Sequence, residues 1–276
     1  MTAASWTTID PAATDIQLVV CDMDGTLLTT AGHFPEGFDE LRELVRARGV
    51  TFVPASGRQL ATLEHMFPGL EGGSFVAENG SIVVHNGEVI STTSVDRDTV
   101  TRVVATVREA EGFDIGLVYC GVNGAYVERT DDAFLAEASK YYAKLDVVDD
   151  LTHVDDPALK LAIFDFTSSQ AVADALLGDL AKSLQVVVSS ANWVDIMVPG
   201  VHKGLGVRAL QEALSVTAAQ TAVFGDYLND FDMISTGDWS FAMANAHPDV
   251  LAEANYVAPS NDEFGVVRVL TYLLSS

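Results

Sequence analysis

Residues 18–28 read LVVCDMDGTLL, from Leu18 to Leu28, and combine an apolar run with a turn that carries two acidic residues. A short run rich in β-branched residues is typical of a buried strand, and Gly25 ends it. Side chains two residues apart on a strand point to the same side. We therefore expect Asp22 and Asp24 to converge just beyond the strand's carboxyl end. That end of the strands is where open α/β sheets bind ligands.

Two carboxylates in one such turn repel each other. At a separation of about 4 Å and an effective dielectric constant of about 20, the repulsion is roughly 4 kcal/mol. The pair therefore needs a cation, a shared proton, or both. A metal-bound nucleophile beside a protonated general acid has this arrangement. Asp and Gly are also common in ordinary acidic turns, which is the alternative interpretation of the motif on its own.

The composition is that of a globular protein with 49% hydrophobic and 20% charged residues among 276. This length allows a full core and favours two domains. Lys and Arg total 15 against 39 for Asp and Glu, which gives a net charge of −24. Binding to nucleic acid or to an anionic membrane depends on a basic surface, so we expect neither as a partner.

The sequence also indicates a compartment. Residues 1–15 contain neither a basic segment nor an apolar stretch, so no secretion signal is expected. No apolar run approaches the roughly 18 residues of a membrane span. The two cysteines, Cys21 and Cys120, lie far apart and predict no disulfide framework. We expect a cytoplasmic protein, and the sequence carries no signal for its oligomeric state.

Strands and helices alternate in the first and last parts of the chain, which predicts a parallel sheet with right-handed crossovers. Strands are predicted over 51–55, 74–77, 221–224, 240–243 and 255–257, and helices over 35–48, 59–66, 204–214 and 265–274. The alternation of strands and helices changes near residue 81, where a hairpin is expected around Asn86-Gly87. Further strands are predicted over 114–120, 125–129, 159–167, 185–189 and 193–198, and helices over 99–111, 131–142 and 169–182. Hairpin strands mixed with helices predict an α+β module inserted into the parallel framework.

Four loops carry polar residues at, or close to, the carboxyl edge of the predicted parallel sheet. They contain Asp22 and Asp24, then Ser56-Gly57, then Lys203-Gly204, and finally Asp226 to Asp230. Each loop alone is also typical of a turn, a helix start or a helix cap. Their occurrence together in this order is much less expected by chance, and we interpret them as one site.

With these motifs the sequence resembles the haloacid dehalogenase (HAD) superfamily and, within it, the Cof-type phosphatases. The four signatures are Asp22-Met-Asp24-Gly-Thr-Leu-Leu, Ser56-Gly57-Arg58, Lys203-Gly204 and Gly225-Asp226-Tyr-Leu-Asn229-Asp230, and Glu78-Asn79-Gly80 and Asn245-Ala246 are similar to further landmarks. The resemblance covers nearly the whole chain. It implies an α/β fold with a Rossmann-like parallel sheet core, residues 1–86 and 193–276, and an inserted α+β cap, residues 87–192, that selects the substrate. Two departures are Tyr227, where a small or polar residue is more usual, and a loop lengthened by Glu263-Phe264.

The resemblance also implies a reaction. In that reaction Asp22 attacks phosphorus to form an aspartyl-phosphate, and Asp24 protonates the leaving oxygen and then activates water. Mg²⁺ is expected on Asp22, on the backbone carbonyl of Asp24 and on Asp226, with Asp230 steadying that shell. The groups expected to hold the transferring oxygens are Ser56, the Gly57 amide, Lys203 and Asn229.

The implied enzyme is therefore a Mg²⁺-dependent phosphomonoester hydrolase. Its substrate is expected to be a small phosphorylated metabolite, with sugar phosphates the leading class and flavin or pyridoxal phosphates behind them. Tyr227 is expected to narrow the site without touching the chemistry.

Three rival functions are considered. A phosphomutase or phosphotransferase of the same superfamily keeps the chemistry and changes the acceptor. A dinucleotide-binding module is indicated by residues 204–209, Gly-Leu-Gly-Val-Arg-Ala, which fit G-x-G-x-x-A and open a helix. That fingerprint should directly follow a strand, whereas residues 199–203 intervene, and it leaves the Asp22 and Asp24 turn unexplained. A non-catalytic protein on this scaffold is disfavoured because both aspartates are present.

Overall fold

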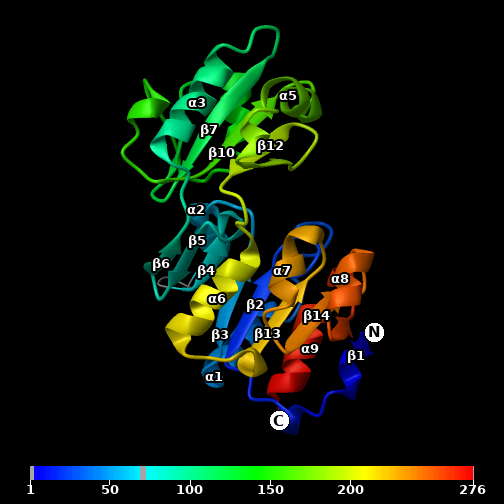
Figure 1. The fold of residues 1–276 in the computed structure, drawn as a ribbon. Coiled ribbons are helices and arrows are strands. Elements are labelled where there is room, and N and C mark those ends of the chain that lie inside the picture. Colours follow the sequence, from blue (N-terminus) through cyan, green and yellow to red (C-terminus); the bar gives the residue numbers. More distant parts are fainter. Residues whose placement is uncertain (1–2, 69–72, 276) are drawn as a thin grey trace. The chain divides into compact units, whose positions relative to one another are not determined.

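The computed structural model describes residues 3–68 and 73–275. The chain divides into two compact units, each built on its own sheet (Figure 1). Of the described residues, the first unit holds 3–56, 73–91 and 202–275, and the second holds 57–68 and 92–201. The polypeptide therefore leaves the first unit twice and returns twice.

The first unit contains a mostly parallel sheet with the strand order β1-β15-β14-β13-β2-β3-β4-β5-β6. Its strands are β1 (Ala4–Ser5), β2 (Leu18–Asp22), β3 (Thr51–Ala55), β4 (Phe75–Ala77), β5 (Ile82–His85), β6 (Glu88–Thr92), β13 (Thr221–Gly225), β14 (Trp239–Met243) and β15 (Tyr256–Ala258). Strand β2 pairs in parallel with β3 on one side and β13 on the other. All five of its residues are buried, as expected for an apolar strand in the middle of a parallel sheet. The carboxyl ends of β2 and β13 therefore lie side by side.

The helices of the first unit bury apolar side chains. They are α1 (Phe38–Ala47), α6 (Lys203–Leu214), α7 (Phe231–Ile234), α8 (Pro248–Glu253) and α9 (Gly265–Leu274). Helix α9 buries Val266, Val269, Leu270 and Leu273, which lie three and four residues apart and form one face. It packs against α1, whereas α6 and α8 pack against α7. Helix α6 also contacts β4 and β5, and this contact fixes its first turn against the sheet.

The second unit contains a sheet with the order β11-β12-β10-β7-β8-β9. Its elements are α2 (Leu60–Met66), α3 (Arg97–Arg108), β7 (Ile115–Gly121), β8 (Ala125–Val127), α4 (Asp132–Ala138), β9 (Leu145–Val147), β10 (Ala158–Asp165), α5 (Ser169–Leu176), β11 (Gln185–Val188) and β12 (Trp193–Met197). Neighbouring strands are antiparallel except β8 and β9. Alternate residues of β10 enter two apolar clusters: Leu161 and Ile163 join one, and Phe164 joins the other together with Phe134 of α4.

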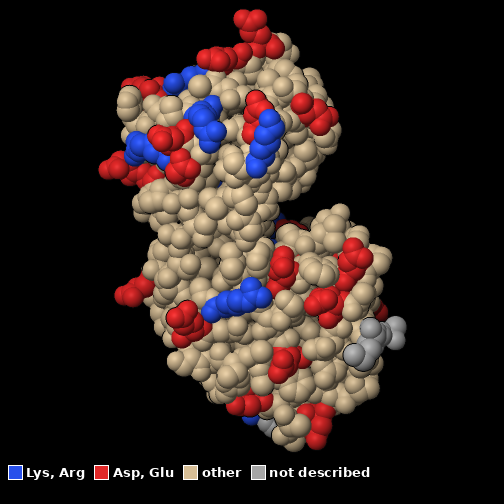
Figure 2. Space-filling model, viewed as in Figure 1, with Lys and Arg blue, Asp and Glu red and all other residues tan. Residues whose placement is uncertain are grey.

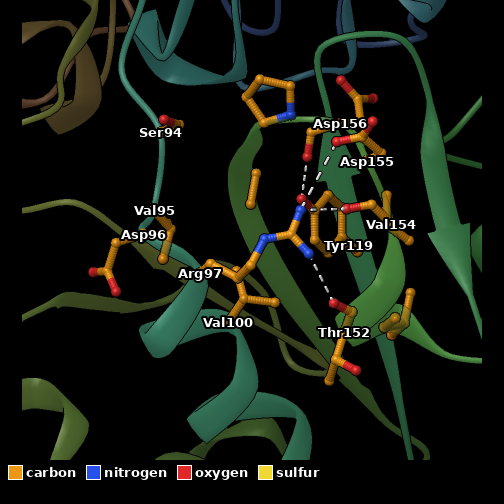
Figure 3. Close-up of a pocket in the computed structure, with 13 residues that line it drawn as sticks. Ser94, Val95, Asp96, Arg97, Val100, Tyr119, Thr152, Val154, Asp155 and Asp156 are labelled. Carbon is orange, nitrogen blue, oxygen red and sulfur yellow. Dashed lines mark hydrogen bonds and ion pairs between the residues drawn. The ribbon is translucent and has the colours of Figure 1, made fainter.

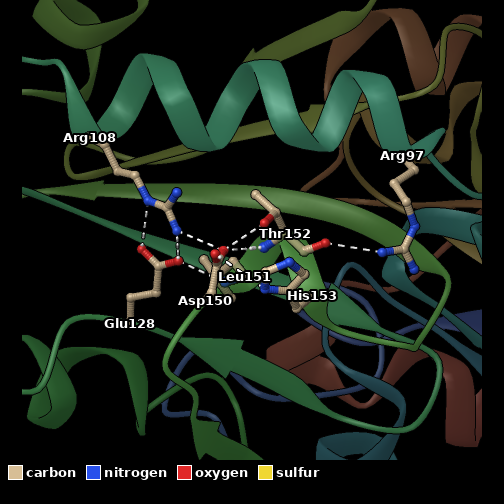
Figure 4. A network of polar contacts seen from close by, with 7 residues as sticks. All are labelled: Arg97, Arg108, Glu128, Asp150, Leu151, Thr152 and His153. Carbon is tan, nitrogen blue, oxygen red and sulfur yellow. Dashed lines mark hydrogen bonds and ion pairs between the residues drawn. The ribbon is translucent and has the colours of Figure 1, made fainter.

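An ion-pair network fixes the carboxyl end of α3 in the second unit (Figure 4). The guanidinium of Arg108 donates to both Glu128 and Asp150. The Leu151 amide also donates to Glu128, at 2.7 Å. Hydrogen bonds from the Thr152 hydroxyl and amide, together with Arg108, hold the pKa of Asp150 below its ordinary value. The network therefore connects α3 with the segment that precedes β10.

The expected α/β fold, a mostly parallel core with an inserted α+β part, is confirmed. Its expected bounds differ from the observed units in three places, of which the first is residues 57–68, expected in the core but found in the second unit. Strand β12, expected in the core, pairs with β10 and β11 of the second sheet. The hairpin β5–β6, expected to be divided at residue 86, lies whole in the first sheet because β5 pairs with β4. Within residues 3–68 and 73–275, no helix has both the length and the apolarity needed to cross a bilayer.

Candidate active site

The acidic turn lies where β2 ends, at the carboxyl edge of the first sheet. Backbone hydrogen bonds close it: the Leu27 amide donates to the Asp22 carbonyl at 3.2 Å, and the Leu28 amide to the Met23 carbonyl at 2.8 Å. Asp22 is 6% exposed, whereas Asp24 is exposed to solvent. The two aspartates of the motif therefore occupy different environments, one buried and one at the surface.

A buried lysine faces the first of these aspartates. Lys203 is the first residue of α6, and its ammonium donates to Asp22 and, at 2.7 Å, to Asp230. Its exposed fraction is 0%. The site therefore encloses one positive charge. The surface is different: acidic side chains are spread over both units on the face drawn in Figure 2, in line with the net charge of −24.

The turn after β13 supplies two further carboxylates, Asp226 and Asp230. Asp230 accepts hydrogen bonds from the backbone amides of Asp226, at 3.0 Å, and Tyr227, at 3.2 Å. One carboxylate oxygen from each of Asp22, Asp226 and Asp230 lies within 4.8 Å of the others. Because β2 and β13 are neighbouring parallel strands, residues about two hundred positions apart come together at one edge of the sheet.

Burial governs the protonation of this cluster. Removal from water, together with the charge of Asp230, raises the pKa of Asp22 to about 8 in spite of Lys203. Burial also raises the pKa of Asp226. Although burial lowers the pKa of Lys203, the charges of Asp22 and Asp230 outweigh it and raise that pKa above its ordinary value. The carboxylates are thus held close together in a place where their negative charges are costly.

The donor set fits a divalent cation. With all three carboxylates ionised and one lysine ammonium, the cluster carries a charge of −2. A divalent ion balances that charge, and carboxylate oxygens are the ligands preferred by hard cations such as Mg²⁺. Burial and the charge of Asp230 raise the pKa values of Asp22 and Asp226, and a bound cation would offset both effects. The described residues therefore form a suitable site for such an ion.

The sequence did not predict how Gly25 and Thr26 position Asp226. Gly25 has a φ of +81°, and a Cβ atom at this position would overlap the Asp226 carboxylate. Only glycine combines this backbone conformation with such a close approach. The Thr26 hydroxyl donates to Asp226 at 2.9 Å. The Asp-Gly-Thr turn can be recognised in the sequence, but Asp226, which Thr26 contacts, lies 200 positions away.

Two asparagines, in the segments that follow β14 and β15, hold the same turn in place. The Asn245 side chain donates to the Gly25 carbonyl at 2.8 Å and accepts from the Asn261 amide at 3.2 Å. The Asn261 side chain donates in turn to the Leu28 carbonyl at 2.9 Å. Asn245 was noted in the sequence as a landmark without a role, and the structure gives it a supporting one. No sequence signal singled out Asn261.

The landmark Glu78-Asn79-Gly80 also has a structural role. Gly80 has a φ of +96°, and a Cβ atom there would lie 2.5 Å from the His202 carbonyl oxygen. The missing side chain lets the chain that leads into Lys203 approach this turn closely. The Asn79 amide donates to the Ser56 carbonyl at 3.0 Å, and the Ser56 amide to Val76 at 2.9 Å. The segment therefore connects the loop of Ser56 with the start of α6.

The remaining expected residues lie on loops that follow strands of the first sheet, outside the carboxylate cluster. Ser56 directly follows β3 and is buried, and Gly57 follows it as the first residue of the second unit. Asn229 is exposed in the turn after β13, beside buried Asp230. The Asp24 side chain is not among the three clustered carboxylates. Asp22, Lys203, Asp226 and Asp230 are thus in contact, whereas the contacts of Asp24, Ser56, Gly57 and Asn229 with a ligand stay predictions.

The structure argues against the dinucleotide-binding alternative. Residues 204–209 lie wholly within α6, which begins at Lys203. A dinucleotide fingerprint instead needs its glycines in the turn between a strand and a helix, where the backbone approaches the pyrophosphate. A Cβ atom on Gly206 would lie 2.6 Å from a Val76 methyl group. The glycine therefore serves the packing of α6 on the sheet.

Comparisons with known proteins agree with this geometry. The sequence profile of haloacid dehalogenase-like hydrolases matches residues 19–270. The chain is 33% identical over 270 residues to a 5-amino-6-(5-phospho-D-ribitylamino)uracil phosphatase of Escherichia coli, covering 94% of this chain and 96% of that protein. It is also 26% identical over 265 residues to a 5-amino-6-(5-phospho-D-ribitylamino)uracil phosphatase of Bacillus subtilis, covering 94% of this chain and 96% of that protein.

A solved structure matches over the same extent. The crystal structure of a Streptococcus mutans protein superposes with a TM-score of 0.78 at 26% identity, and the match covers 95% of this chain and 100% of the other. The similarity thus extends over both sheets. The family match, the phosphatase relatives and the acidic cluster at the carboxyl edge lead to one conclusion. The chain belongs to the haloacid dehalogenase-like hydrolases, in their Cof-type group, and is a phosphatase.

Proposed function

We propose that the protein is a Mg²⁺-dependent phosphomonoesterase that acts on a small phosphorylated metabolite through an aspartyl-phosphate on Asp22. The observation that carries the proposal is the buried cluster in which Lys203 contacts Asp22 and Asp230 while Asp226 lies beside them. A phosphoryl group brings further negative charge to such a place. Its transfer therefore depends on positioning and on charge neutralisation.

The first half-reaction transfers the phosphoryl group to the protein. An oxygen of Asp22 forms a bond to phosphorus while the ester P–O bond breaks, and Asp24 gives a proton to the leaving oxygen. In the second half-reaction Asp24 takes a proton from water, the water oxygen bonds to phosphorus, and the bond to Asp22 breaks. Inorganic phosphate and a free Asp22 carboxylate result. The exposed position of Asp24 beside buried Asp22 suits a group that exchanges protons with substrate and water.

The negative charges of the phosphoryl group need positive charges beside them. Mg²⁺, held by Asp22, Asp226 and the Asp24 backbone carbonyl with Asp230 beside it, would supply positive charge against the phosphoryl oxygens. Lys203 supplies a second, permanent charge at Asp22. We assign the remaining contacts with the transferring oxygens to Ser56, the Gly57 amide and Asn229.

The activities of two relatives support a proposal for the substrate class. Two of them are phosphatases of 5-amino-6-(5-phospho-D-ribitylamino)uracil, an ester of a sugar alcohol that carries a pyrimidine ring. We propose esters of this kind and simple sugar phosphates as the first substrates to examine. The second unit, which contains most of the expected cap over residues 87–192, is proposed as the part that selects among these substrates. We keep the cytoplasm as the proposed compartment, in line with two cysteines that are buried and unbridged.

Phosphate release from a panel of phosphomonoesters tests the proposal. We expect turnover with Mg²⁺ and its loss in excess chelator, with recovery when Mg²⁺ is restored. Asp22→Asn should lower kcat by about 10⁴-fold or more, because an amide is a poor nucleophile toward phosphorus. Rapid quenching of the wild type with a ³²P-labelled ester should trap label on the protein, and the Asp22→Asn variant should trap none. Full activity in chelator, or wild-type turnover by Asp22→Asn, contradicts the proposal.

A phosphomutase or phosphotransferase remains the rival with the same chemistry. The two activities differ in the acceptor of the second half-reaction, which is water in one and a hydroxyl of a second molecule in the other. Release of free phosphate from a simple ester, with no added sugar bisphosphate or acceptor alcohol, favours the hydrolase. Transfer of label to an added sugar phosphate that outpaces phosphate release favours the rival.

A further inference from the structure

The loop between β15 and α9 contains Glu263-Phe264, the two residues that lengthen it. Glu263 accepts hydrogen bonds from the Ser260 hydroxyl at 2.8 Å and from the Ser260 amide at 3.2 Å. Phe264 has a φ of +60°, and the Gly265 amide then donates to the Ser260 carbonyl at 3.1 Å. The two added residues therefore close residues 260–265 into a compact turn, which we call the 260–265 turn.

Two successive side chains of the 260–265 turn hold the chain that leaves the acidic motif. The Asn261 side chain donates to the Leu28 carbonyl at 2.9 Å. Asp262 accepts hydrogen bonds from the Thr30 amide at 2.8 Å and from the Thr30 hydroxyl at 2.7 Å. These contacts join residues that are 233 and 232 positions apart. The turn therefore fixes the path by which the chain leaves the motif toward α1.

Leu28 connects Asn261 with the residue before Asp24. The Leu28 amide donates to the Met23 carbonyl at 2.8 Å, and Asp24 pairs with Leu28 in an isolated β-bridge. Leu28 is only 2% exposed. Both polar backbone groups of Leu28 are thus engaged, the carbonyl with Asn261 and the amide with Met23. A shift of Leu28 therefore shifts the backbone just before Asp24.

A second route leads from Asn261 to the residue after Asp24. The Asn261 backbone amide donates to the Asn245 side chain at 3.2 Å, and that side chain donates to the Gly25 carbonyl at 2.8 Å. The carbonyls on both sides of Asp24, those of Met23 and Gly25, are therefore held by chains of hydrogen bonds that begin at Asn261. Asn261 itself is 5% exposed, so burial fixes its own position.

The placement of the Asp24 carboxyl group depends on this backbone. Its side chain is exposed, whereas Met23 and Leu28 are buried. A general acid has to come within hydrogen-bond reach of the leaving oxygen, about 2.6–3.2 Å. A displacement of about 1 Å can lower a rate about a hundred-fold. We therefore expect proton transfer by Asp24 to be sensitive to the contacts of Asn261.

The nucleophile is held by a different contact. The Asp22 side chain accepts from the ammonium of Lys203, which is the first residue of α6. This ion pair involves no residue of the 260–265 turn. Attack on phosphorus by Asp22 and protonation by Asp24 thus depend on separate contacts, and a change at Asn261 can affect one without the other.

We propose that Asn261 is a positioning residue for proton transfer by Asp24, and that Asp262 supports it by holding Thr30; the inference rests on the proposed phosphatase function. In the first half-reaction Asp24 gives its proton to the leaving oxygen as the ester P–O bond breaks. The resulting carboxylate takes a proton from water in the second. Asn261 acts on both steps through the backbone on either side of Asp24.

Two esters with different leaving groups test the inference. D-Ribitol 5-phosphate has an alkyl leaving group that needs a proton, whereas the aryl leaving group of p-nitrophenyl phosphate needs little protonation. For both, kcat/KM reports the first half-reaction alone, because the alcohol leaves before the aspartyl-phosphate is hydrolysed. Asn261→Ala should lower kcat/KM about a hundred-fold for the alkyl ester and at most about three-fold for the aryl ester. A general loss of folded protein would lower both by the same factor.

Asp262→Ala is a second variant that keeps the inference testable if Asn261→Ala folds poorly, because Asp262 is exposed. It should lower kcat/KM of the alkyl ester about ten-fold, as for a lost hydrogen bond, and leave the aryl ester nearly unchanged. Asp262→Asn keeps an oxygen that can accept from Thr30. This conservative variant should therefore recover most of the loss.

Asp96 provides a matched control. It lines a hollow of about 310 Å³ in the second unit (Figure 3). Like Asp262, it accepts hydrogen bonds from the amide and the hydroxyl of one threonine, Thr99, both at 2.8 Å. Asp96→Ala removes the same kinds of bond at the start of α3. It should lower stability and leave the ratio of kcat/KM between the two esters unchanged.

A double variant shows whether Asn261 acts through Asp24. Asp24→Asn alone should slow the alkyl ester, and adding Asn261→Ala should then lower kcat/KM by at most about three-fold more, because coupled residues are not additive. A further loss of about a hundred-fold would mean that the two residues act independently, and it would overturn the inference.

Hydrogen exchange separates failure of the inference from failure of the proposed function. Amide exchange of residues 22–30, followed by mass spectrometry, needs no turnover. Faster exchange in Asn261→Ala, but not in Asp96→Ala, supports the hold on the loop even if the wild type hydrolyses neither ester, an outcome that refutes the phosphatase. Hydrolysis of both esters by the wild type, with equal losses for both in Asn261→Ala and in Asp262→Ala, overturns the inference and leaves the phosphatase standing. Unchanged exchange in Asn261→Ala also overturns it.

Discussion

The side chains of Asp22 and Lys203 meet across 181 positions of the sequence, at the end of β2 and the start of α6. Both are almost completely buried, and Lys203 reaches Asp230 as well. This contact fixes the first turn of α6 to the carboxyl edge of the sheet. It also places a permanent positive charge beside the residue that we propose as the nucleophile. Two of the expected loops are therefore joined by an ion pair before any ligand binds.

Replacement of Lys203 by methionine should destabilise the metal-free protein. Asp230 would then be buried without its counter-charge, and loss of one partner of a buried pair typically costs about 3–5 kcal/mol. We expect the free energy of unfolding at pH 7, measured in urea, to fall by about that amount. Added Mg²⁺ should restore part of the loss, because it neutralises the same carboxylates.

Lys182→Met serves as the control for that experiment, since its ion pair with Asp179 is exposed. Exposed pairs contribute little, so a change of at most about 0.5 kcal/mol is expected. An unfolding midpoint of Lys203→Met equal to that of the wild type, in chelator and in Mg²⁺ alike, would show that the ion pair does not hold the site together.

A second prediction concerns Gly25 and the metal. In Gly25→Ala the new methyl group has to displace the Asp226 carboxylate, which lies against the Gly25 backbone. We expect the Mg²⁺ concentration for half-maximal activity to rise at least about ten-fold, in the range seen when groups around metal ligands are lost. The thermal stabilisation by Mg²⁺, measured as the rise in Tm without substrate, should shrink as well.

The chain offers a matched control for the backbone strain of that substitution. Gly32 also has a positive φ, +76°, but a Cβ atom there meets nothing within 4 Å. Gly32→Ala should therefore cost stability through the backbone alone and leave the Mg²⁺ requirement unchanged. Equal Mg²⁺ dependence in the two variants would mean that the contact between Gly25 and Asp226 has no part in metal binding.

The general position of the site followed from the sequence because strand ends and turn residues are local signals. Asp22 is found at the end of a buried strand and Asp226 directly after β13, and each loop could be recognised separately. The pairing of Lys203 with Asp22 and Asp230 could not be predicted, because it depends on which strands are neighbours. The same reason explains β12: an apolar strand does not reveal which sheet it joins until its partners are known.

Short strands and helices could not be predicted for a different reason. Strand β1, Ala4–Ser5, and helix α7, Phe231–Ile234, are too short to show a periodic pattern. Helix α4 was expected to reach residue 142 but ends at Ala138. Tyr142 lies in the apolar cluster that α4 contributes to, so this residue is buried without being helical.

The start of α3 allows a prediction with a pH dependence. Asp96 caps this helix by accepting hydrogen bonds from the Thr99 amide and hydroxyl, both at 2.8 Å, and these bonds lower its pKa. A carboxyl group whose pKa is lower in the folded state stabilises the protein above its unfolded pKa of about 3.9 and loses that effect as pH falls through the folded value. Asp96→Ala should therefore cost about 1 kcal/mol of stability at pH 7.

The difference between wild type and Asp96→Ala should narrow as the pH is lowered below about 4. Urea unfolding followed by circular dichroism at several pH values between 7 and 3 measures it. Asp98→Ala is the control, since it removes the same charge one residue beyond the first helical position and Asp98 is exposed. If Asp98→Ala were as destabilising as Asp96→Ala at pH 7, charge near the helix end, rather than capping, would explain both.

The last prediction concerns Asp24 and separates proton transfer from metal binding. If Asp24 is the acid and base, Asp24→Asn should severely slow the first half-reaction of alkyl phosphate esters, whose leaving oxygen needs a proton. Aryl esters leave without much protonation, so their first half-reaction should be nearly unchanged. Hydrolysis of the aspartyl-phosphate should slow for both, because water loses its base. Rapid quenching with an aryl ester at saturating Mg²⁺ should then show a burst of about one product per site, followed by slow turnover. The Asp24 side chain is exposed and is not one of the three clustered carboxylates, which is compatible with this assignment. Absence of the burst, with activity restored simply by more Mg²⁺, would instead assign the Asp24 carboxylate to the metal.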